Sequence, residues 1–340
     1  MAKVRRPTLS DVAQVVGVSA KTVSRVLNGD GPAAPETKRR VLEAAAELGF
    51  QPNLMARNIR TGDPDSTIGL VIPDMANPFF GTVASGIEAV ASERGLTVIL
   101  GSSDDDPERE RSLVATFLAR RVSALLVVPS PGADHRPLRA QRSGGPPVVF
   151  LDRPGQGLAA DCVVSANRTG ARAGVAHLLA QGHRRVAFLG DLPGNLYTRR
   201  ERLLGYRDAL AEAGLPYDRD LIDNGHDQDA TAAATNRLLT HRRPPTAVFA
   251  ANNFAAMGAV LALARAGRRD IALVGFDDIP LAEVLQPALT VVAQDPVTIG
   301  RTAAERVFAR LDGDRSRAHA TEVPTQLIPR GSGELPPPAS

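Results

Sequence analysis

One stretch near the N-terminus, residues 8–28, constrains the fold of this chain most, because it encodes two short helices joined by a tight turn. Thr8 and Asp11 have the spacing of a capping box, which predicts that a first helix begins after Thr8. Gly17 is a natural stop for that helix, and Ser19 can cap a second one. The stretch therefore predicts a helix-turn-helix.

The second predicted helix, over about residues 20–27, has two chemically different sides. At 3.6 residues per turn, Val23, Val26 and Leu27 cluster on one side. The other side carries small and hydrogen-bonding residues: Ala20, Lys21, Ser24, Arg25 and Asn28. We expect the apolar side to pack on the first helix and the polar side to face outward. The alternative is an ordinary helical hairpin with a solvated polar face.

A third helix is predicted from Glu36 to Leu48, after a loop rich in glycine and proline. Its apolar positions at helical spacing are Val41, Leu42, Ala45 and Leu48, and Gly49 is its expected stop. Three helices in about fifty residues make a small domain whose core holds only a handful of side chains.

The charge of the chain is unevenly placed. Residues 1–62 hold ten Lys/Arg and five Asp/Glu, whereas the remainder holds 30 and 32. A basic N-terminal end on a near-neutral body indicates contact with a polyanion at that end only.

From Ile68 onward, short apolar runs alternate with amphipathic helices. The predicted strands are 68–72, 97–100, 124–128, 148–151, 186–189, 247–250 and 271–274. The predicted helices are 82–94, 109–120, 167–181, 202–213, 230–239 and 254–266. Continuous Val/Ile/Leu strands between helices favour parallel sheets covered on both faces, and the length favours two doubly wound lobes. The overall class is therefore α/β, with a helical headpiece and a two-lobed core.

Polar side chains follow the predicted strands, at the edge where doubly wound folds bind ligands. They are Asp74, Asn77, residues 102–106, Asp152, Arg153, Asp191, Asn252, Asn253, Asp277 and Asp278. The acidic run at residues 104–106 is interpreted as a loop that leads into a helix and not as a metal site. Residues 333–340, with three consecutive prolines, are predicted to be a disordered tail.

Composition narrows the class of protein further. Cys162 is the only cysteine, so no intrachain disulfide can form and a cytoplasmic location is expected. The first 30 residues have no apolar signal-peptide core, and no apolar run reaches the ~20 residues of a membrane span. We expect no cofactor, no bound metal and no membrane partner.

The ordered set of motifs resembles the lac repressor (LacI/GalR) family of bacterial transcriptional regulators from residue 8 to about 332. The matching segments are 8–13, 17–28, 52–53, 56–57, 68–73, 77–80, 151–153, 202–206, 251–253, 274–277 and 330–332. The resemblance implies four parts: a headpiece (1–50), a hinge (51–65), a two-lobed effector-binding and dimerisation core (66–332) and the tail (333–340).

The resemblance also implies a sequence-specific repressor that binds a palindromic DNA operator as a homodimer. Ala20, Lys21 and Arg25 would approach base edges, because lysine and arginine suit the guanine acceptors and alanine can pack on a thymine methyl. Ser19, Thr22, Asn28 and Thr37 would bind phosphates.

The hinge would be a short helix that enters the minor groove and kinks the duplex. Its implied DNA-binding residues are Asn53, Ala56, Arg57 and Ile59. Ile59 stands where the family usually has leucine, so a wedge is expected, although the β-branch restricts its rotamers.

A small effector would bind between the lobes, and lobe closure would act as the allosteric switch. The implied effector-binding residues are Asn77, Phe79, Asp104, Arg153, Arg202, Asn252, Asp277 and Gln294. Carboxylates, amides, guanidinium groups and one aromatic face suit a sugar. Asn253 stands where many relatives have aspartate. The tail has no heptads, which favours a dimer over a tetramer.

Three alternatives are considered. A periplasmic-type sugar-binding receptor would have the same two-lobed core but not the basic headpiece. A purine-responsive regulator of the same family would differ only in its ligand. An enzyme is disfavoured, because the chain has no phosphate-binding glycine loop, no G-x-S-x-G and no metal-spaced His/Cys cluster.

Overall fold

The structure is a computed structural model that describes residues 7–28, 32–50, 65–143, 145–192 and 195–338. The chain divides into two compact units: residues 1–65, which include the predicted headpiece, and residues 66–340, which include the predicted two-lobed core. Each unit is described by itself.

The headpiece contains three helices: α1 (Leu9–Val16), α2 (Ala20–Asn28) and α3 (Pro35–Glu47). The predicted capping box is present, since the Thr8 backbone N–H donates to Asp11 Oδ2 over 2.7 Å and Thr8 Oγ1 accepts from the Asp11 N–H. Gly17 adopts the left-handed conformation (φ 74°) that ends α1. The helix-turn-helix prediction is confirmed at residue level.

Among the described residues, the fully buried side chains of the headpiece are all valines and alanines. The buried residues are Val12, Ala13, Val16, Val23, Val26, Val41, Ala44 and Ala45. Of the four apolar positions at helical spacing in the predicted third helix, Val41 and Ala45 are buried, whereas Leu42 and Leu48 are 47% and 37% exposed. Ala44 is buried as well.

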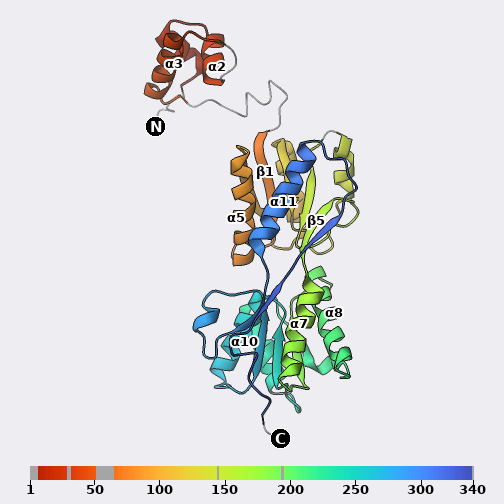
Figure 1. The fold of residues 1–340 in the computed structure, drawn as a ribbon. Helices are drawn as coiled ribbons and strands as arrows, with labels where there is room; N and C mark the ends of the chain where they lie inside the picture. The colour runs from red at the N-terminus through yellow and green to blue at the C-terminus, as the bar shows by residue number, and fades with distance from the viewer. Residues whose placement is uncertain (1–6, 29–31, 51–64, 144, 193–194, 339–340) are drawn as a thin grey trace. The chain divides into compact units, whose positions relative to one another are not determined.

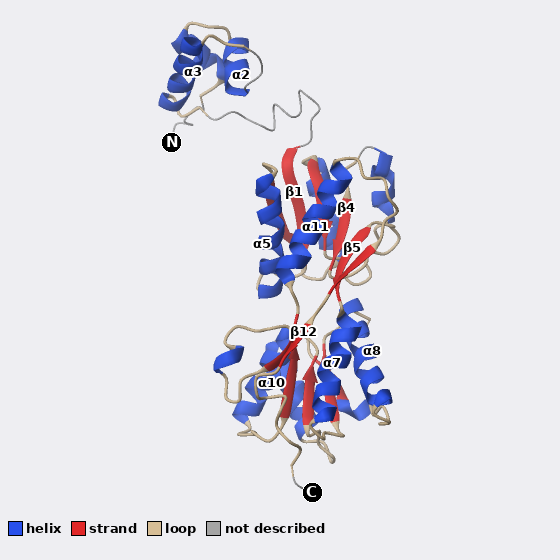
Figure 2. Cartoon of the chain, in the orientation of Figure 1, coloured by secondary structure: helices blue, strands red, loops and turns tan. Residues whose placement is uncertain are grey.

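The core contains two six-stranded sheets, each with helices on both faces (Figures 1 and 2). The first sheet defines the N-lobe, in the order β11 (Ala320–Val323), β5 (Asp161–Ser165), β4 (Val148–Leu151), β3 (Val122–Val127), β1 (Asp65–Ile72) and β2 (Thr97–Ser102). Its helices are α5 (Pro78–Glu93), α6 (Pro107–Ala119), α11 (Pro296–Leu311) and the 3-10 helix η1 (Arg136–Ser143).

The second sheet defines the C-lobe, in the order β12 (Gln326–Ile328), β10 (Thr290–Ala293), β9 (Ala272–Phe276), β8 (Ala247–Ala250), β6 (Val186–Gly190) and β7 (Ile222–Asn224). Its helices are α7 (Asn167–Ala180), α8 (Tyr197–Glu212), α9 (Gln228–Leu239), α10 (Asn253–Arg265) and two 3-10 turns, η2 (Arg219–Leu221) and η3 (Ala282–Val284).

The chain crosses between the lobes three times: from β5 to α7, from β10 to α11 and from β11 to β12. Each lobe is therefore built from two separate parts of the sequence. Figure 1 shows α11, from the C-terminal part, beside α5 on one face of the N-lobe sheet.

The doubly wound α/β prediction is confirmed. All seven predicted strands and all six predicted core helices are present, with ends shifted by a few residues. The prediction omitted β5, β7, β10, β11, β12 and α11. Most of the omitted strands are three to five residues long, too short for a clear period. One of them, β12, pairs antiparallel with β10.

The prediction of a disordered tail is wrong for its first residues. The Glu334 carboxylate accepts from Thr290 Oγ1 over 2.8 Å and from the Gly331 N–H, and it pairs with His177. The Leu335 side chain packs on the C-lobe core, and its carbonyl lies 2.8 Å from Nε2 of the buried His183. Proline content misled the prediction, because these contacts depend on tertiary structure.

Among the described residues, no helix is both long and apolar enough to span a membrane.

Candidate functional site

The outward side of α2 carries the residues predicted to read DNA. Ala20, Lys21 and Arg25 are exposed. Neither Lys21 nor Arg25 makes a hydrogen bond or ion pair with the described residues. Ser19 Oγ accepts from the Thr22 N–H over 3.1 Å and so begins the helix. Lys21 and Arg25 therefore present donors that the described residues do not use.

The structure describes only some of the other residues that are predicted to contact DNA. Thr37 is half-buried in the first turn of α3. Asn28 ends α2, but its side chain lies outside the described residues, as do the hinge residues Asn53, Ala56, Arg57 and Ile59.

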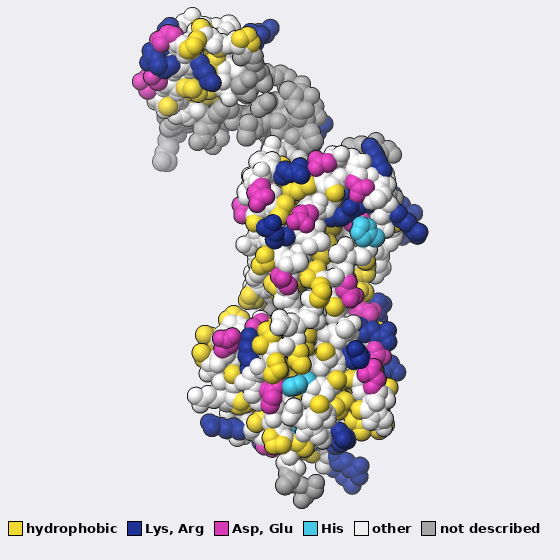
Figure 3. All heavy atoms as spheres, in the orientation of Figure 1, with side chains coloured by type: hydrophobic (Ala, Val, Ile, Leu, Met, Phe, Trp, Pro, Cys, Tyr) yellow, Lys and Arg dark blue, Asp and Glu magenta, His cyan; other side chains and the backbone are white. Residues whose placement is uncertain are grey.

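The eight predicted effector residues all line one cleft between the lobes of the core: Asn77, Phe79, Asp104, Arg153, Arg202, Asn252, Asp277 and Gln294. They come from loops at the carboxyl ends of strands or from the helices that follow. Elsewhere on the core, side chains of both signs are interspersed over the face in Figure 3, which fits its near-neutral charge.

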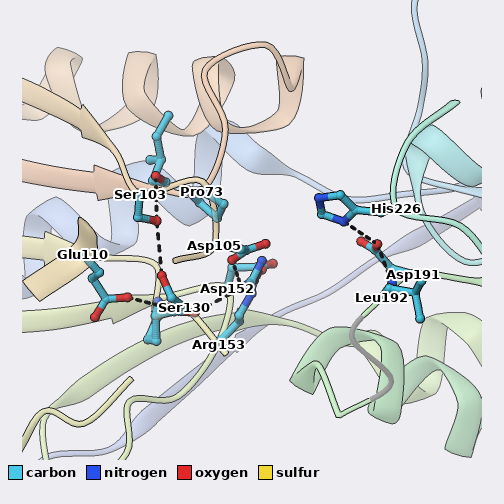
Figure 4. Close-up of polar contacts among 12 residues, drawn as sticks. Pro73, Ser103, Asp105, Glu110, Ser130, Asp152, Arg153, Asp191, Leu192 and His226 are labelled. Atoms are coloured by element: carbon cyan, nitrogen blue, oxygen red, sulfur yellow. Dashed lines mark hydrogen bonds and ion pairs between the residues drawn. The ribbon is translucent and has the colours of Figure 1, made fainter. Parts of the chain in front are cut away.

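On the N-lobe wall of the cleft, Arg153 is 7% exposed and held between two carboxylates. Its Nη1 donates to Asp105 Oδ1 over 2.6 Å and its Nε to Asp152 Oδ2 over 3.3 Å (Figure 4). Although burial favours loss of the proton, Asp105 and Asp152 raise the pKa of Arg153 above its usual value. The guanidinium therefore stays charged.

On the C-lobe wall, Arg202 is 4% exposed, and its guanidinium carbon Cζ lies 3.8 Å from the ring centroid of Phe276. Its Nε donates to Asn167 Oδ1 and its Nη1 to the Ala251 carbonyl, each over 2.7 Å. Burial lowers the pKa of Arg202, and the nearby Asp277 carboxylate opposes that shift.

Asp277 belongs to a hydrogen-bonded chain that reaches the lobe crossings. Burial raises the pKa of its carboxyl, against the effect of Arg202. The Gln294 amide donates to Asp277, and its oxygen accepts from Ser165 Oγ. Ser165 ends β5 at one crossing, and Gln294 follows β10 at another. The chain thus couples a cleft carboxylate to two of the three interlobe connections.

The two walls of the cleft are also joined by a hydrogen bond between two asparagine side chains. Asn77 Oδ1 caps α5 by accepting from the Phe79 N–H, and it also accepts from Asn253 Nδ2 over 2.7 Å. An aspartate at 253 could not donate this bond. The Asn253 side chain therefore makes a direct contact between the lobes.

A second polar group on the C-lobe wall surrounds Asp191. Asn252 Nδ2 donates to Asp191 Oδ2 over 2.9 Å, and His226 Nδ1 lies 3.5 Å from Asp191 Oδ1 (Figure 4). Burial raises the pKa of Asp191. Asn252 also caps α10 through the Ala255 N–H, so the helix start orients the amide.

Several cleft residues were absent from the predicted set: Asp74, Phe80, Asp105, Asp152, Asp191, Leu196, Thr198, Arg199, His226, Asp227, Asn253 and Phe254. Some were named as strand-end residues, but His226 and Asp227 follow the unpredicted strand β7. Arg199 lies one helical turn before Arg202, a spacing that could have indicated it. Asp278, a strand-end residue, pairs with Arg330 outside the cleft lining.

The acidic run at residues 104–106 leads into α6, as predicted: Asp106 caps the helix by accepting from the Glu108 N–H over 2.7 Å. Asp104 pairs with Arg109 over 3.1 Å and Asp105 with Arg153. No group of three or more potential metal ligands occurs among the described residues.

The fold and site define a class: a helix-turn-helix headpiece joined to a two-lobed, ligand-binding core. Residues 8–53 match the model of the bacterial regulatory proteins, lacI family, and residues 175–333 match a periplasmic binding protein-like domain. The HTH-type transcriptional regulator CelR of Thermobifida fusca is 34% identical over 98% of this chain and 100% of its own length.

Solved structures agree. The lac repressor dimer bound to operator and the anti-inducer ONPF is 28% identical, with a TM-score of 0.84 over 97% of this chain and 99% of the other. A CelR–cellobiose complex is 31% identical, with a TM-score of 0.71 over 96% and 100%. This chain belongs to the lacI family of bacterial transcriptional regulators.

Proposed function

We propose that this protein represses transcription by binding a palindromic operator as a homodimer, and that a sugar bound in the cleft controls this binding. Lys21 and Arg25 read bases, while Ser19, Thr22, Asn28 and Thr37 contact phosphates. The hinge binds at the minor groove through Asn53, Ala56 and Ile59, with Arg57 near the phosphates.

The observation that carries the sugar proposal is the composition of the cleft. Seven carboxylates, three asparagines, a glutamine and three arginines line the cleft together with Phe79. The ring of Phe79 is half-buried, so it can cover the C–H face of a sugar. CelR was solved with cellobiose, which makes cellobiose the first probe.

The dimer proposal is supported by exposed apolar side chains in the C-lobe. Of the large apolar side chains that the structure describes, Leu281 and Val284 are the most exposed, at 73% and 69%. Leu281 also has a left-handed backbone (φ 66°), which is unfavourable for leucine. A second copy would cover this surface.

The test is in vitro selection of random DNA duplexes with the purified full-length protein, followed by titration of the selected duplex with and without each ligand. We expect a two-fold symmetric sequence, two chains per duplex, and a change in affinity with cellobiose, galactose or ribose. A response only to adenine or hypoxanthine would replace the sugar with a purine. Failure to enrich any sequence would refute the proposal that this protein is a sequence-specific repressor.

A further inference from the structure

The N-lobe contains a buried acid–histidine pair that does not line the cleft. Glu110 on α6 and His135 are each 3% exposed, and Glu110 Oε1 lies 2.8 Å from His135 Nε2. Glu110 has no lysine or arginine partner among the described residues. A buried carboxylate is costly unless its hydrogen bonds are satisfied, so its partners show what it holds in place.

Glu110 holds the turn that contacts Arg153. Its Oε2 accepts from the backbone N–H of Ser130 (Figure 4). The preceding carbonyl, of Pro129, accepts from Arg153 Nη1 over 3.1 Å. The carboxylate therefore positions a backbone oxygen that accepts from the guanidinium.

His135 holds the chain on the other side of Arg153. Its Nδ1 lies 3.1 Å from the backbone nitrogen of Gln156 and 3.2 Å from the backbone carbonyl oxygen of Gln156. The backbone N–H of His135 donates to the same carbonyl over 2.9 Å. Its ring packs edge-on against Phe150 at 4.7 Å. Gln156 is three residues after Arg153, so both backbone segments beside Arg153 are tied to one pair.

These contacts leave one end of Arg153 for a ligand. Its Nε and Nη1 are used by Asp152, Asp105 and the Pro129 carbonyl. Its Nη2 makes no hydrogen bond with the described residues, and Arg153 lines the cleft. The two carboxylates balance its charge, so Nη2 suits a neutral acceptor such as a hydroxyl or carbonyl oxygen.

We propose that Glu110 and His135 are positioning residues that aim Arg153 Nη2 at an acceptor oxygen of the ligand. The proposal rests on the proposed function for its ligand. The pair acts in ligand recognition, because it fixes the backbone on both sides of Arg153. The direction of that guanidinium decides whether Nη2 reaches an oxygen of the ligand.

The first test needs no ligand: hydrogen exchange of the full-length protein, with a crystal structure of each variant. In Glu110→Ala, we expect the amides of Ser130 and Gln156 to lose protection together, and Arg153 to leave its observed position. Glu110→Gln should keep the Ser130 amide protected, because the amide oxygen can accept from Ser130. Its amide nitrogen would donate to His135 Nε2, which places the imidazole proton on Nδ1 and removes the acceptor of the Gln156 N–H, so only the Gln156 amide should lose protection in this variant. The idea is wrong if Gln156 stays protected and Arg153 does not move in Glu110→Ala.

Asp161→Ala provides the matched control. Asp161 is a 3%-exposed carboxylate of the same lobe, bound by Arg310 Nε over 2.7 Å. This variant should also lower stability, yet leave the Ser130 and Gln156 amides protected. Loss of their protection here too would mean that any destabilisation of the lobe displaces the turn, and would overturn the assignment.

The second test measures calorimetric affinity for cellobiose, or for whichever of galactose and ribose binds the wild-type protein. Loss of one charge-assisted hydrogen bond should weaken binding about tenfold in Glu110→Ala and in Arg153→Met. The double variant should be no weaker than Arg153→Met, whereas multiplied effects would overturn the proposal. If no sugar binds the wild-type protein, the proposed function fails, and hydrogen exchange still decides the positioning.

Discussion

The outward face of α2 and the interlobe cleft both present arginine or lysine to a partner, but they hold these groups in opposite ways. Lys21 and Arg25 are exposed on a helix that is complete without them. Arg153 and Arg202 are 7% and 4% exposed, and each donates hydrogen bonds to the protein. Substitution of an exposed lysine or arginine leaves the fold intact. Substitution of a buried arginine also removes hydrogen bonds that stabilise the site.

This difference fits two tasks. A surface that reads DNA benefits from donors that act separately, because each base pair is recognised by its own contact. A switch benefits from groups that move together. The cleft residues Asp277 and Gln294 form one hydrogen-bonded chain with Ser165 at a lobe crossing, so a ligand that contacts Asp277 can affect the crossing.

The largest expected effect is from Arg202→Met. The substitution leaves Asn167 Oδ1 and the Ala251 carbonyl without their donor and Asp277 without its nearby cation. Breaking such a buried charged arrangement should cost about 3–5 kcal/mol in the free energy of unfolding of the core, measured by urea denaturation. Arg25→Met is the control and should change stability by no more than ~0.5 kcal/mol. If Arg202→Met and Arg25→Met lowered the free energy of unfolding equally, the contrast between the cleft and the outward face of α2 would be wrong.

Lys21→Ala should show the reverse pattern, with an effect on reading and none on folding. We expect discrimination at one base pair of the selected operator to fall by about 1–3 kcal/mol, measured across a set of operator variants. Lys38→Ala, on the exposed side of α3, should leave the relative affinities unchanged. If Lys21→Ala weakened every duplex equally, Lys21 would be a phosphate contact.

Thr8→Ala tests whether the small headpiece tolerates loss of local structure. The capping box links Thr8 and Asp11 in both directions. Its removal should cost about 1 kcal/mol, seen as faster hydrogen exchange of the α1 amides in the full-length protein. Ser10→Ala, at a neighbouring exposed site, should have little effect. Unchanged exchange in Thr8→Ala would show that packing alone maintains α1.

The smallest expected effect is a pH dependence in the C-lobe. Burial lowers the pKa of His183 below its usual value of 6.5. The unfolded chain then takes up the proton more readily, so stability is complete above about pH 6.5 and falls as pH decreases through the folded pKa. Thermal unfolding from pH 8 to 5 should show this loss, and His183→Gln should reduce the slope by less than about one proton. An unchanged slope would assign the loss to other groups.

The headpiece was almost fully predictable, because its signals are local. Thr8, Asp11, Gly17 and Ser19 act within four residues of their partners. Burial at single positions is not local in this way: Leu42 and Leu48 fit the helical period as Val41 and Ala45 do, yet the two leucines are exposed.

The cleft was predictable in its membership but not in its contacts. Strand ends are visible in the sequence, and all eight named residues line it. The sequence showed no sign of the bond between Asn77 and Asn253, 176 positions apart, or of the pair formed by Glu110 and His135. Such pairs depend on strand order and on the three lobe crossings.

The sequence by itself therefore determined the elements with a period or a cap: the three headpiece helices, most strands and helices of the core, and the polar loops at the strand ends. Hydrogen bonds and apolar spacing within one or two turns are sufficient for these. Only the tertiary structure decided which loops meet, that residues 333–335 pack on the C-lobe, and which arginine atoms remain for a ligand. These outcomes depend on burial and on contacts between distant segments, which local spacing does not encode.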